Sequence, residues 1–135
     1  MISDTVNLEV VQKLYEAFGR GDLPAILSHL AEDVSWKYLG PAEIPFAGTR
    51  HGKEQVAQFF AAIAGSLEVQ DFGVDRFIAQ GDMVVALGHE RMHVKATGRT
   101  YKTDWAHVFT LRDGKIVEFR EYADSAAVAE AFRGS

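Results

Sequence analysis

Apolar residues recur along the chain with two different periods, and the change falls near residue 67. In the opening segment Val10, Leu14 and Phe18 lie four apart, a spacing that predicts an amphipathic helix. Gly19 and Gly21 follow and predict where this helix ends. Two further helices are expected, one with Asp22 as its N-cap. Their apolar faces are formed by Ile26, Leu27 and Leu30, and by Val56, Phe59, Phe60 and Ile63.

Beyond residue 67, runs rich in β-branched and aromatic residues alternate with turn signals. These signals are Gly81-Asp82, Thr97-Gly98 and Asp113-Gly114, and their spacing predicts three consecutive hairpins. A short strand is also expected at Val34–Tyr38, followed by a loop with two prolines and two glycines. A closing helix is expected at residues 125–132, with Asp124 as its N-cap. Helices that precede a run of strands are typical of the α+β class, and 135 residues suit a single domain, 1–135.

Turn type decides which side chains share a face of the sheet. The segments ATGR and RDGK each fit a three-residue loop that ends in a left-handed glycine. Lys95 then pairs with Arg99, and Leu111 with Lys115. One face is expected to carry Leu87, His89, Arg91, His93, Thr103, Trp105, His107, Phe109, Phe119 and Glu121. A two-residue type I′ turn is the alternative, and it brings Arg120 and Tyr122 beside His107 instead.

The last strand favours the first of these registers. Val117, Phe119, Glu121 and Ala123 form one face that is apolar apart from Glu121, whereas the other face suits water. A lone carboxylate in an apolar stripe is costly unless it is paired or protonated. Glu121 is therefore the leading candidate for a functional residue.

Composition narrows the functional classes. The formal net charge is -5, which argues against nucleic acid as a partner because a general nucleic-acid binder carries a basic stripe. The chain has no cysteine, so disulfides, thiolate nucleophiles and cysteine-ligated metals are excluded. Charged residues interrupt the apolar pattern of the first helix, and no membrane span or signal peptide is expected there. A cytoplasmic location is the default expectation.

Several segments resemble the nuclear-transport-factor-two-like, SnoaL-like superfamily, which includes ketosteroid isomerase, polyketide cyclases and limonene epoxide hydrolase. They are LYEAFGRGDLPAILSHLAEDVSW, PFAGTRHGKEQVAQFF, HERMHV and HVFTLRDGKIVEFREYAD. The resemblance implies a curved antiparallel sheet with helices packed on its concave face around a cone-shaped pocket. It also implies a homodimer through the convex face, where Val84, Ala86, Met92 and Val94 are expected.

Position by position, the resemblance is partial. His107 and Glu121 match the pocket histidine and acidic base of SnoaL-like cyclases, where the base is usually Asp. Arg91 matches the arginine of the epoxide hydrolases, but His93 and Glu121 replace their two aspartates. Trp36 and Tyr38 replace the residues that orient water in those hydrolases. The isomerase triad is absent, since Tyr38 and His107 stand at two of its acidic positions.

These residues support a small-molecule enzyme that uses acid–base chemistry without a cofactor. Glu121 is the expected base, His107 the partner acid or hydrogen-bond donor, and Arg91 the electrostatic support. The reaction is expected to be isomerisation, cyclisation or hydrolysis of an apolar carbonyl compound or epoxide. The expected substrate-binding residues are Trp36, Tyr38, Phe60, His89, His93, Trp105, Phe109 and Phe119.

Three alternatives stay open. A non-catalytic protein could bind a small apolar ligand in the same pocket, with Glu121 held in a structural ion pair by Arg91. The chain could instead be an interaction module. His89, His93, His107 and Glu121 also suggest a metal site, but His89 and His93 lie about 13 Å apart along one strand. That separation argues against metal coordination, and no metal is expected.

Overall fold

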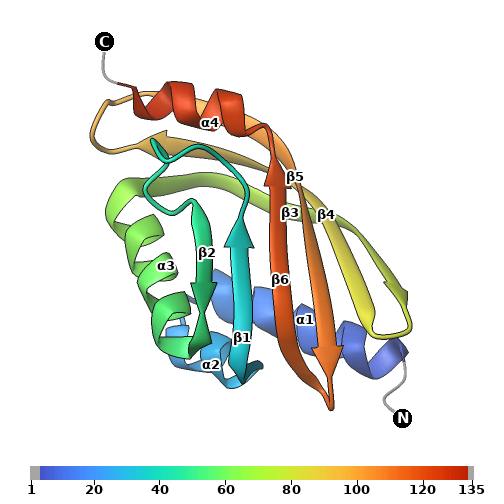
Figure 1. Ribbon diagram of the computed structural model, residues 1–135. Coiled ribbons are helices and arrows are strands. Elements are labelled where there is room, and N and C mark those ends of the chain that lie inside the picture. The colour runs from blue at the N-terminus through green and yellow to red at the C-terminus, as the bar shows by residue number, and fades with distance from the viewer. Residues whose placement is uncertain (1–3, 134–135) are drawn as a thin grey trace.

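Six strands form one bent sheet, and helices cover one of its faces (Figure 1). The computed structural model describes residues 4–133. The helices are α1 (Asp4–Gly19), α2 (Leu23–Ser28), α3 (Gly52–Ser66) and α4 (Ser125–Phe132). The strands are β1 (Leu30–Tyr38), β2 (Gly48–His51), β3 (Leu67–Gln80), β4 (Met83–Val94), β5 (Thr100–Arg112) and β6 (Lys115–Ala123). The order of helices, hairpins and closing helix confirms the predicted α+β fold.

The strand order is β2-β1-β6-β5-β4-β3. Neighbouring strands run antiparallel except β1 and β6, which are parallel. The sheet was expected to be antiparallel, and the β1–β6 pair is the exception. It arises because β1 pairs with β6, the last strand of the hairpin series, at the free edge of that series. The short edge strand β2 occupies the segment that was expected to be a loop.

The helices pack against the concave face of the sheet. Helix α1 packs against β3 and β4, α3 packs against β1 and β2, and α2 lies between α1 and α3. The predicted N-caps are both present: the Asp22 carboxylate accepts from the Ala25 N–H at 3.1 Å, and the Asp124 carboxylate from the Ala127 N–H at 3.2 Å. Leu30, expected on the second helix, is instead the first residue of β1. None of the helices within residues 4–133 is long and apolar enough to cross a membrane.

The hairpin between β4 and β5 differs from the prediction by one residue. The Val94 N–H donates to the Arg99 carbonyl at 2.7 Å, and Gly98 has a φ of +74°. The loop therefore has four residues, and Val94 rather than Lys95 faces Arg99. Because side chains alternate along a strand, this shift moves every side chain of β4 to the opposite face. Burial decides the outcome, since Val84, Ala86, Met92 and Val94 are all at most 3% exposed.

The hairpin between β5 and β6 uses the alternative turn. Asp113 and Gly114 both have positive φ, +52° and +75°, as a two-residue type I′ turn requires, and Arg112 pairs with Lys115. A β-bulge then follows, because Leu111 pairs with Ile116 while Thr110 pairs with Glu118. The extra residue, Val117, reverses the effect of the shorter turn. Glu121 consequently lies directly opposite His107, and Tyr122 is 43% exposed, so the predicted face of β6 is confirmed although the predicted turn was wrong.

Candidate active site

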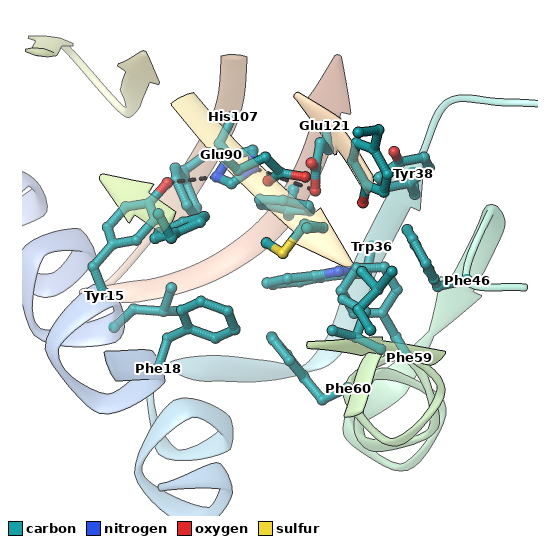
Figure 2. Close-up of a pocket in the computed structure, with 18 residues that line it drawn as sticks. Tyr15, Phe18, Trp36, Tyr38, Phe46, Phe59, Phe60, Glu90, His107 and Glu121 are labelled. Atoms are coloured by element: carbon teal, nitrogen blue, oxygen red, sulfur yellow. Dashed lines mark hydrogen bonds and ion pairs between the residues drawn. The ribbon is translucent and has the colours of Figure 1, made fainter. Parts of the chain in front are cut away.

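An enclosed chamber lies between the helices and the concave face of the sheet (Figure 2). Its free volume is about 60 Å³. Most of its wall is aromatic or aliphatic, contributed by Leu14, Phe18, Trp36, Phe46, Phe59, Phe60, Ile63, Leu67, Phe72, Met92, Phe109 and Phe119. Its polar lining residues are Tyr15, Tyr38, Glu90, Tyr101, His107 and Glu121. A small number of polar groups in an apolar enclosure is typical of a small-molecule site.

The sheet brings the polar groups together from four strands. Tyr38 lies on β1, Glu90 on β4, Tyr101 and His107 on β5, and Glu121 on β6. Pairing explains their proximity, because Tyr38 and His107 both lie beside Glu121 in the sheet register. Figure 2 shows the polar ends of Tyr38, Glu90, His107 and Glu121 at one end of the chamber, and Phe18 and Phe60 at the other.

Tyr15 reaches this cluster from α1 and fixes the state of His107. The Tyr15 hydroxyl lies 2.6 Å from Nδ1 of His107. Burial, with the nearby charge of Glu121, raises the pKa of Tyr15 well above its usual value, so its oxygen keeps its proton and donates to Nδ1. The ring proton of a neutral His107 is thereby assigned to Nε2, which lies 3.2 Å from Oε1 of Glu121.

The contact between His107 and Glu121 is close but not well aligned. Although Nε2 and Oε1 are within ion-pair distance, their angle falls short of a hydrogen bond, and among the described residues Nε2 has no hydrogen-bond partner. Trp105 holds the imidazole in this orientation, with ring centroids 3.9 Å apart and planes 14° from parallel. The Nε2–H is therefore a donor available to a bound molecule.

Two buried carboxyl groups lie at the polar end of the chamber. Glu90 is 9% exposed and Glu121 is 7% exposed. Burial, followed by the charge of Glu121, raises the pKa of Glu90 to about 8, against a smaller opposing effect of the Tyr101 hydroxyl. Near neutral pH Glu90 is thus a protonated acid that stands close to the Glu121 side chain. An acid held protonated beside a second carboxyl group can supply an acid and a base in one site.

Two tyrosine hydroxyls add further donors. Tyr38 is 3% exposed and Tyr101 is 5% exposed, yet neither hydroxyl makes a hydrogen bond of full geometry within residues 4–133. Burial, together with the nearby carboxylates, raises the pKa of both phenols above the usual value, so both keep their protons. Buried polar groups are normally paired, and unpaired donors that converge in a chamber are suited to binding an oxygen of a ligand.

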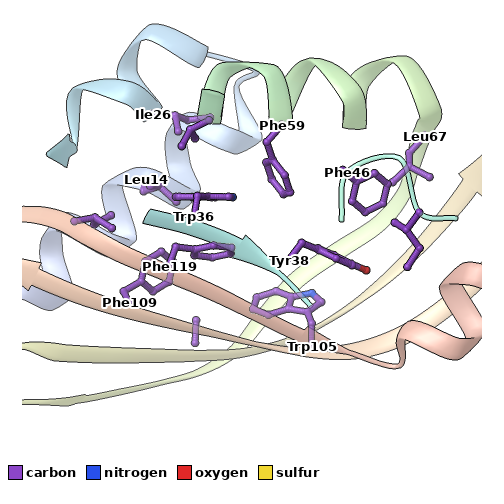
Figure 3. Packing of buried hydrophobic residues seen from close by; sticks show 14 of the residues in the cluster. Leu14, Ile26, Trp36, Tyr38, Phe46, Phe59, Leu67, Trp105, Phe109 and Phe119 are labelled. Atoms are coloured by element: carbon purple, nitrogen blue, oxygen red, sulfur yellow. The ribbon is translucent and has the colours of Figure 1, made fainter. Parts of the chain in front are cut away.

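Stacked rings make the chamber wall rigid. Trp36 and Phe119 stack with centroids 3.8 Å apart, and Figure 3 shows Phe59 directed from α3 toward Trp36. Trp105 lies across its pairing partner Gly88 on β4. A Cβ added at Gly88 would lie 2.1 Å from Cζ2 of the indole. The absence of a side chain at Gly88 is therefore what allows Trp105 to lie flat under His107.

Most of the predicted site residues line or support the chamber. Trp36, Tyr38, Phe60, His107, Phe109, Phe119 and Glu121 line the chamber as expected. Trp105 is buried behind it and contacts His107.

Arg91, His89 and His93 were placed wrongly, because the shift in β4 turns them to the outer face. There His89 lies 2.9 Å from Asp75 and 3.4 Å from Asp71, and His93 lies 3.9 Å from Glu68. The expected support of Glu121 by Arg91, whether catalytic or structural, is therefore excluded by the register. The same shift separates His89 and His93 from His107 and Glu121, so these four side chains cannot share a metal ion.

Three polar lining residues were missed: Tyr15, Glu90 and Tyr101. The sequence does contain a signal for Glu90, because Glu90 shares one face of β4 with the apolar residues Val84, Ala86, Met92 and Val94. The argument that singled out Glu121, a carboxylate in an apolar stripe, applies equally to Glu90. Tyr15 lies beside the apolar stripe of α1, and only the packing of α1 on the sheet reveals its contact with His107.

Comparison with known proteins agrees with this geometry. Residues 11–119 match the SnoaL-like domain family. The chain belongs to this family. An NTF2-like protein from Burkholderia xenovorans LB400 is 33% identical, with 98% of this chain and 100% of that chain covered and a TM-score of 0.91. The resemblance seen in the sequence is therefore confirmed.

Three other proteins are similar to this chain to different extents. TerC, co-crystallised with polyporic acid, is 28% identical over 94% of this chain and 98% of its own, with a TM-score of 0.81. A Mesorhizobium loti protein named as a SnoaL-like polyketide cyclase is 25% identical over 85% of this chain and 97% of its own, with a TM-score of 0.71. The uncharacterised protein YesE of Bacillus subtilis (strain 168) is 44% identical over 43 residues, which are 32% of this chain and 29% of that protein.

Proposed function

We propose that this SnoaL-like protein is a cofactor-free acid–base enzyme that moves a proton on a small apolar carbonyl compound. The feature that carries the proposal is the placement of two buried carboxyl groups, Glu121 and a protonated Glu90, at the polar end of an apolar chamber. The relatives support the class of ligand, because TerC was crystallised with a small organic molecule and another neighbour is named as a cyclase. Isomerisation through an enol is the reaction that this set of groups fits best.

Each group has a defined task in such a reaction. The Glu121 carboxylate takes a proton from the carbon next to the carbonyl. The electron pair of that C–H bond forms a carbon–carbon double bond, and the π pair of the carbonyl moves onto its oxygen. The developing negative charge accepts hydrogen bonds from donors already in place, among them the hydroxyls of Tyr38 and Tyr101 and the Glu90 acid. His107 keeps its Nε2 beside Glu121. In a β,γ-unsaturated substrate the dienolate can be protonated at the γ carbon, and delivery of the proton there from Glu121 completes the isomerisation.

The test is exchange of carbon-bound hydrogen. Small cyclic ketones are incubated with the protein in D₂O, and deuterium at the carbon beside the carbonyl is measured by mass spectrometry. Wild type is expected to exceed the buffer rate, and Glu121→Gln to lose at least about a hundredfold of that excess, the usual contribution of a general base. Glu118→Gln is the matched control, since Glu118 lies on the other face of the same strand.

Two results would contradict the proposal. Exchange that is equal in Glu121→Gln and wild type would remove Glu121 as the base. Ketone binding without exchange in any member of the panel would identify a non-catalytic binding protein that uses the same chamber.

A further inference from the structure

A second, larger hollow opens outside the chamber. It lies between the end of α1, the turn into α2, α3 and the first half of β3, and its free volume is about 810 Å³. Its lining among the described residues contains one charged side chain, Asp71. Val69, which belongs to this lining, is 52% exposed, an unusual position for a large apolar side chain on a strand. This hollow is called the outer groove below.

The outer groove and the chamber share part of their walls. Six side chains line both: Tyr15, Phe18, Phe60, Ile63, Leu67 and Phe72. Phe18 contacts Phe60 and Phe72, with ring centroids 6.2 Å and 5.1 Å apart. All three phenylalanines are only partly buried. They form an aromatic partition between two apolar spaces.

The polar groups lie at one end of the chamber, away from the outer groove. The carboxyl and hydroxyl groups of Glu90, Glu121 and Tyr38 lie at the end away from Phe18 and Phe60 (Figure 2). A molecule that enters from the groove must therefore lead with its oxygen-bearing end. The chamber itself is small, since about 60 Å³ is free whereas an apolar cavity that binds benzene measures about 150 Å³. A ring therefore needs more room than the chamber alone offers, and the adjoining outer groove can take whatever is attached behind it.

We infer that the outer groove is a binding subsite for the apolar extension of an elongated carbonyl substrate. The carbonyl end occupies the chamber, and an aliphatic or aryl extension lies along Ala61, Ala64 and Val69 in the groove. The inference rests on the proposed function in assigning a carbonyl compound to the chamber. Affinity should then grow with the length of the extension, because each added methylene leaves water for an apolar wall.

The test uses a series of alkyl phenyl ketones, from acetophenone through butyrophenone and hexanophenone to octanophenone. Binding to the wild-type protein is measured by isothermal titration calorimetry. The dissociation constant is expected to fall roughly two- to fourfold for each methylene, as burial of a CH₂ group implies. A dissociation constant that does not change with chain length, or no binding by any ketone of the series, would overturn the inference.

Variants test whether the increase in affinity with chain length comes from the outer groove. Ala64 is an exposed α3 residue in the groove lining, so Ala64→Trp fills the groove without entering the core. It is expected to abolish the gain, so that octanophenone binds no more tightly than acetophenone to this variant. Gln58→Trp, on an exposed position of the same helix outside the lining, is the matched control and should keep the full gain. Val69→Lys is a second variant on a different element and should act like Ala64→Trp. Retention of the gain in both groove variants would overturn the inference.

The two proposals fail in different ways. A chain-length gain with no deuterium exchange in any ketone would preserve the subsite and contradict the enzymatic function. Exchange of acetophenone with no chain-length gain would preserve the enzymatic function and contradict the subsite.

Discussion

At the scale of single residues, the site depends on groups whose chemistry burial has changed. Glu90 illustrates this, because its folded-state pKa of about 8 lies above its usual value of 4.5. The folded protein therefore binds this proton more tightly than the unfolded chain does. The resulting stabilisation is complete below pH 4.5 and is lost as the pH rises through about 8.

Glu90→Gln should remove this pH dependence, because an amide resembles the protonated acid in shape and carries no charge. Urea unfolding is expected to give similar stabilities for wild type and variant at pH 5. At pH 9 the variant should be more stable by about 2–4 kcal/mol. Glu118→Gln, on the outer face of β6, serves as control and should follow wild type at both values. Parallel curves for wild type and Glu90→Gln would show that Glu90 is not a desolvated acid.

Tyr15 is a positioning residue, since it acts on His107 rather than on the chamber's contents alone. With Tyr15 donating to Nδ1, ¹⁵N NMR of the wild type should show neutral His107 protonated at Nε2. Tyr15→Phe removes the donor and should give a mixture of the two tautomers, together with about a tenfold loss of ketone exchange, in line with one buried hydrogen bond. An unchanged ¹⁵N signature in Tyr15→Phe would refute the assignment of the proton.

At the scale of elements, hairpin geometry decides which residues enter the chamber. The four-residue loop after β4 turns Glu90 inward and Arg91 outward, and the bulge at Val117 turns Glu121 back inward after the type I′ turn. A change of one residue in either place would exchange the two faces of a strand. The polar cluster is therefore a product of loop length as much as of residue identity.

Gly88→Ala tests the close packing between β4 and β5. The added Cβ would lie 2.1 Å from the Trp105 indole and 2.3 Å from the Gly73 carbonyl oxygen, and the backbone atom cannot rotate away. A loss of about 3 kcal/mol in unfolding free energy is expected, with a changed Trp105 fluorescence spectrum. Gly65→Ala on α3 is the control, because its Cβ meets nothing within 4 Å, and it should gain about 0.5 kcal/mol. Equal stabilities of the two variants would contradict this packing argument.

At the scale of the whole molecule, the outer face of the sheet carries exposed apolar side chains. Ile78, Met83, Leu87 and Tyr122 are 36–49% exposed and lie on β3, β4 and β6. The residues expected on this face, Val84, Ala86, Met92 and Val94, are instead buried in the core. The homodimer implied by family resemblance stays a proposal, now with a different set of contact residues.

We propose that this outer face forms the dimer contact. Light scattering at micromolar concentration is expected to give twice the 14.9 kDa chain mass for wild type and a monomer for Leu87→Glu, since a buried unpaired charge opposes association. Val69→Glu, at a more exposed position on the groove side, should remain dimeric. A wild-type monomer would sink the proposal.

Much of this molecule is determined by local sequence. The predicted helices and hairpins rest on signals that act over a few neighbouring residues: the helical spacing of Val10, Leu14 and Phe18, the caps Asp22 and Asp124, and the glycine turns at residues 81, 98 and 114. Pattern alone therefore predicts these elements and their order, but it missed the short strand β2. Glu121 could be predicted for a related reason, since the alternation of apolar and polar residues along β6 indicates which face of the strand is buried.

The tertiary structure decided what depends on contacts between distant segments. A four-residue loop and a three-residue loop differ little in sequence near Gly98, and only the burial of Val84, Ala86, Met92 and Val94 against the helices selects between them. That selection brought Glu90 into the chamber and turned His89, Arg91 and His93 away from it. The contact of Tyr15 with His107 joins residues 92 apart in the chain, and its cause is the packing of α1 on the sheet, which no local pattern encodes.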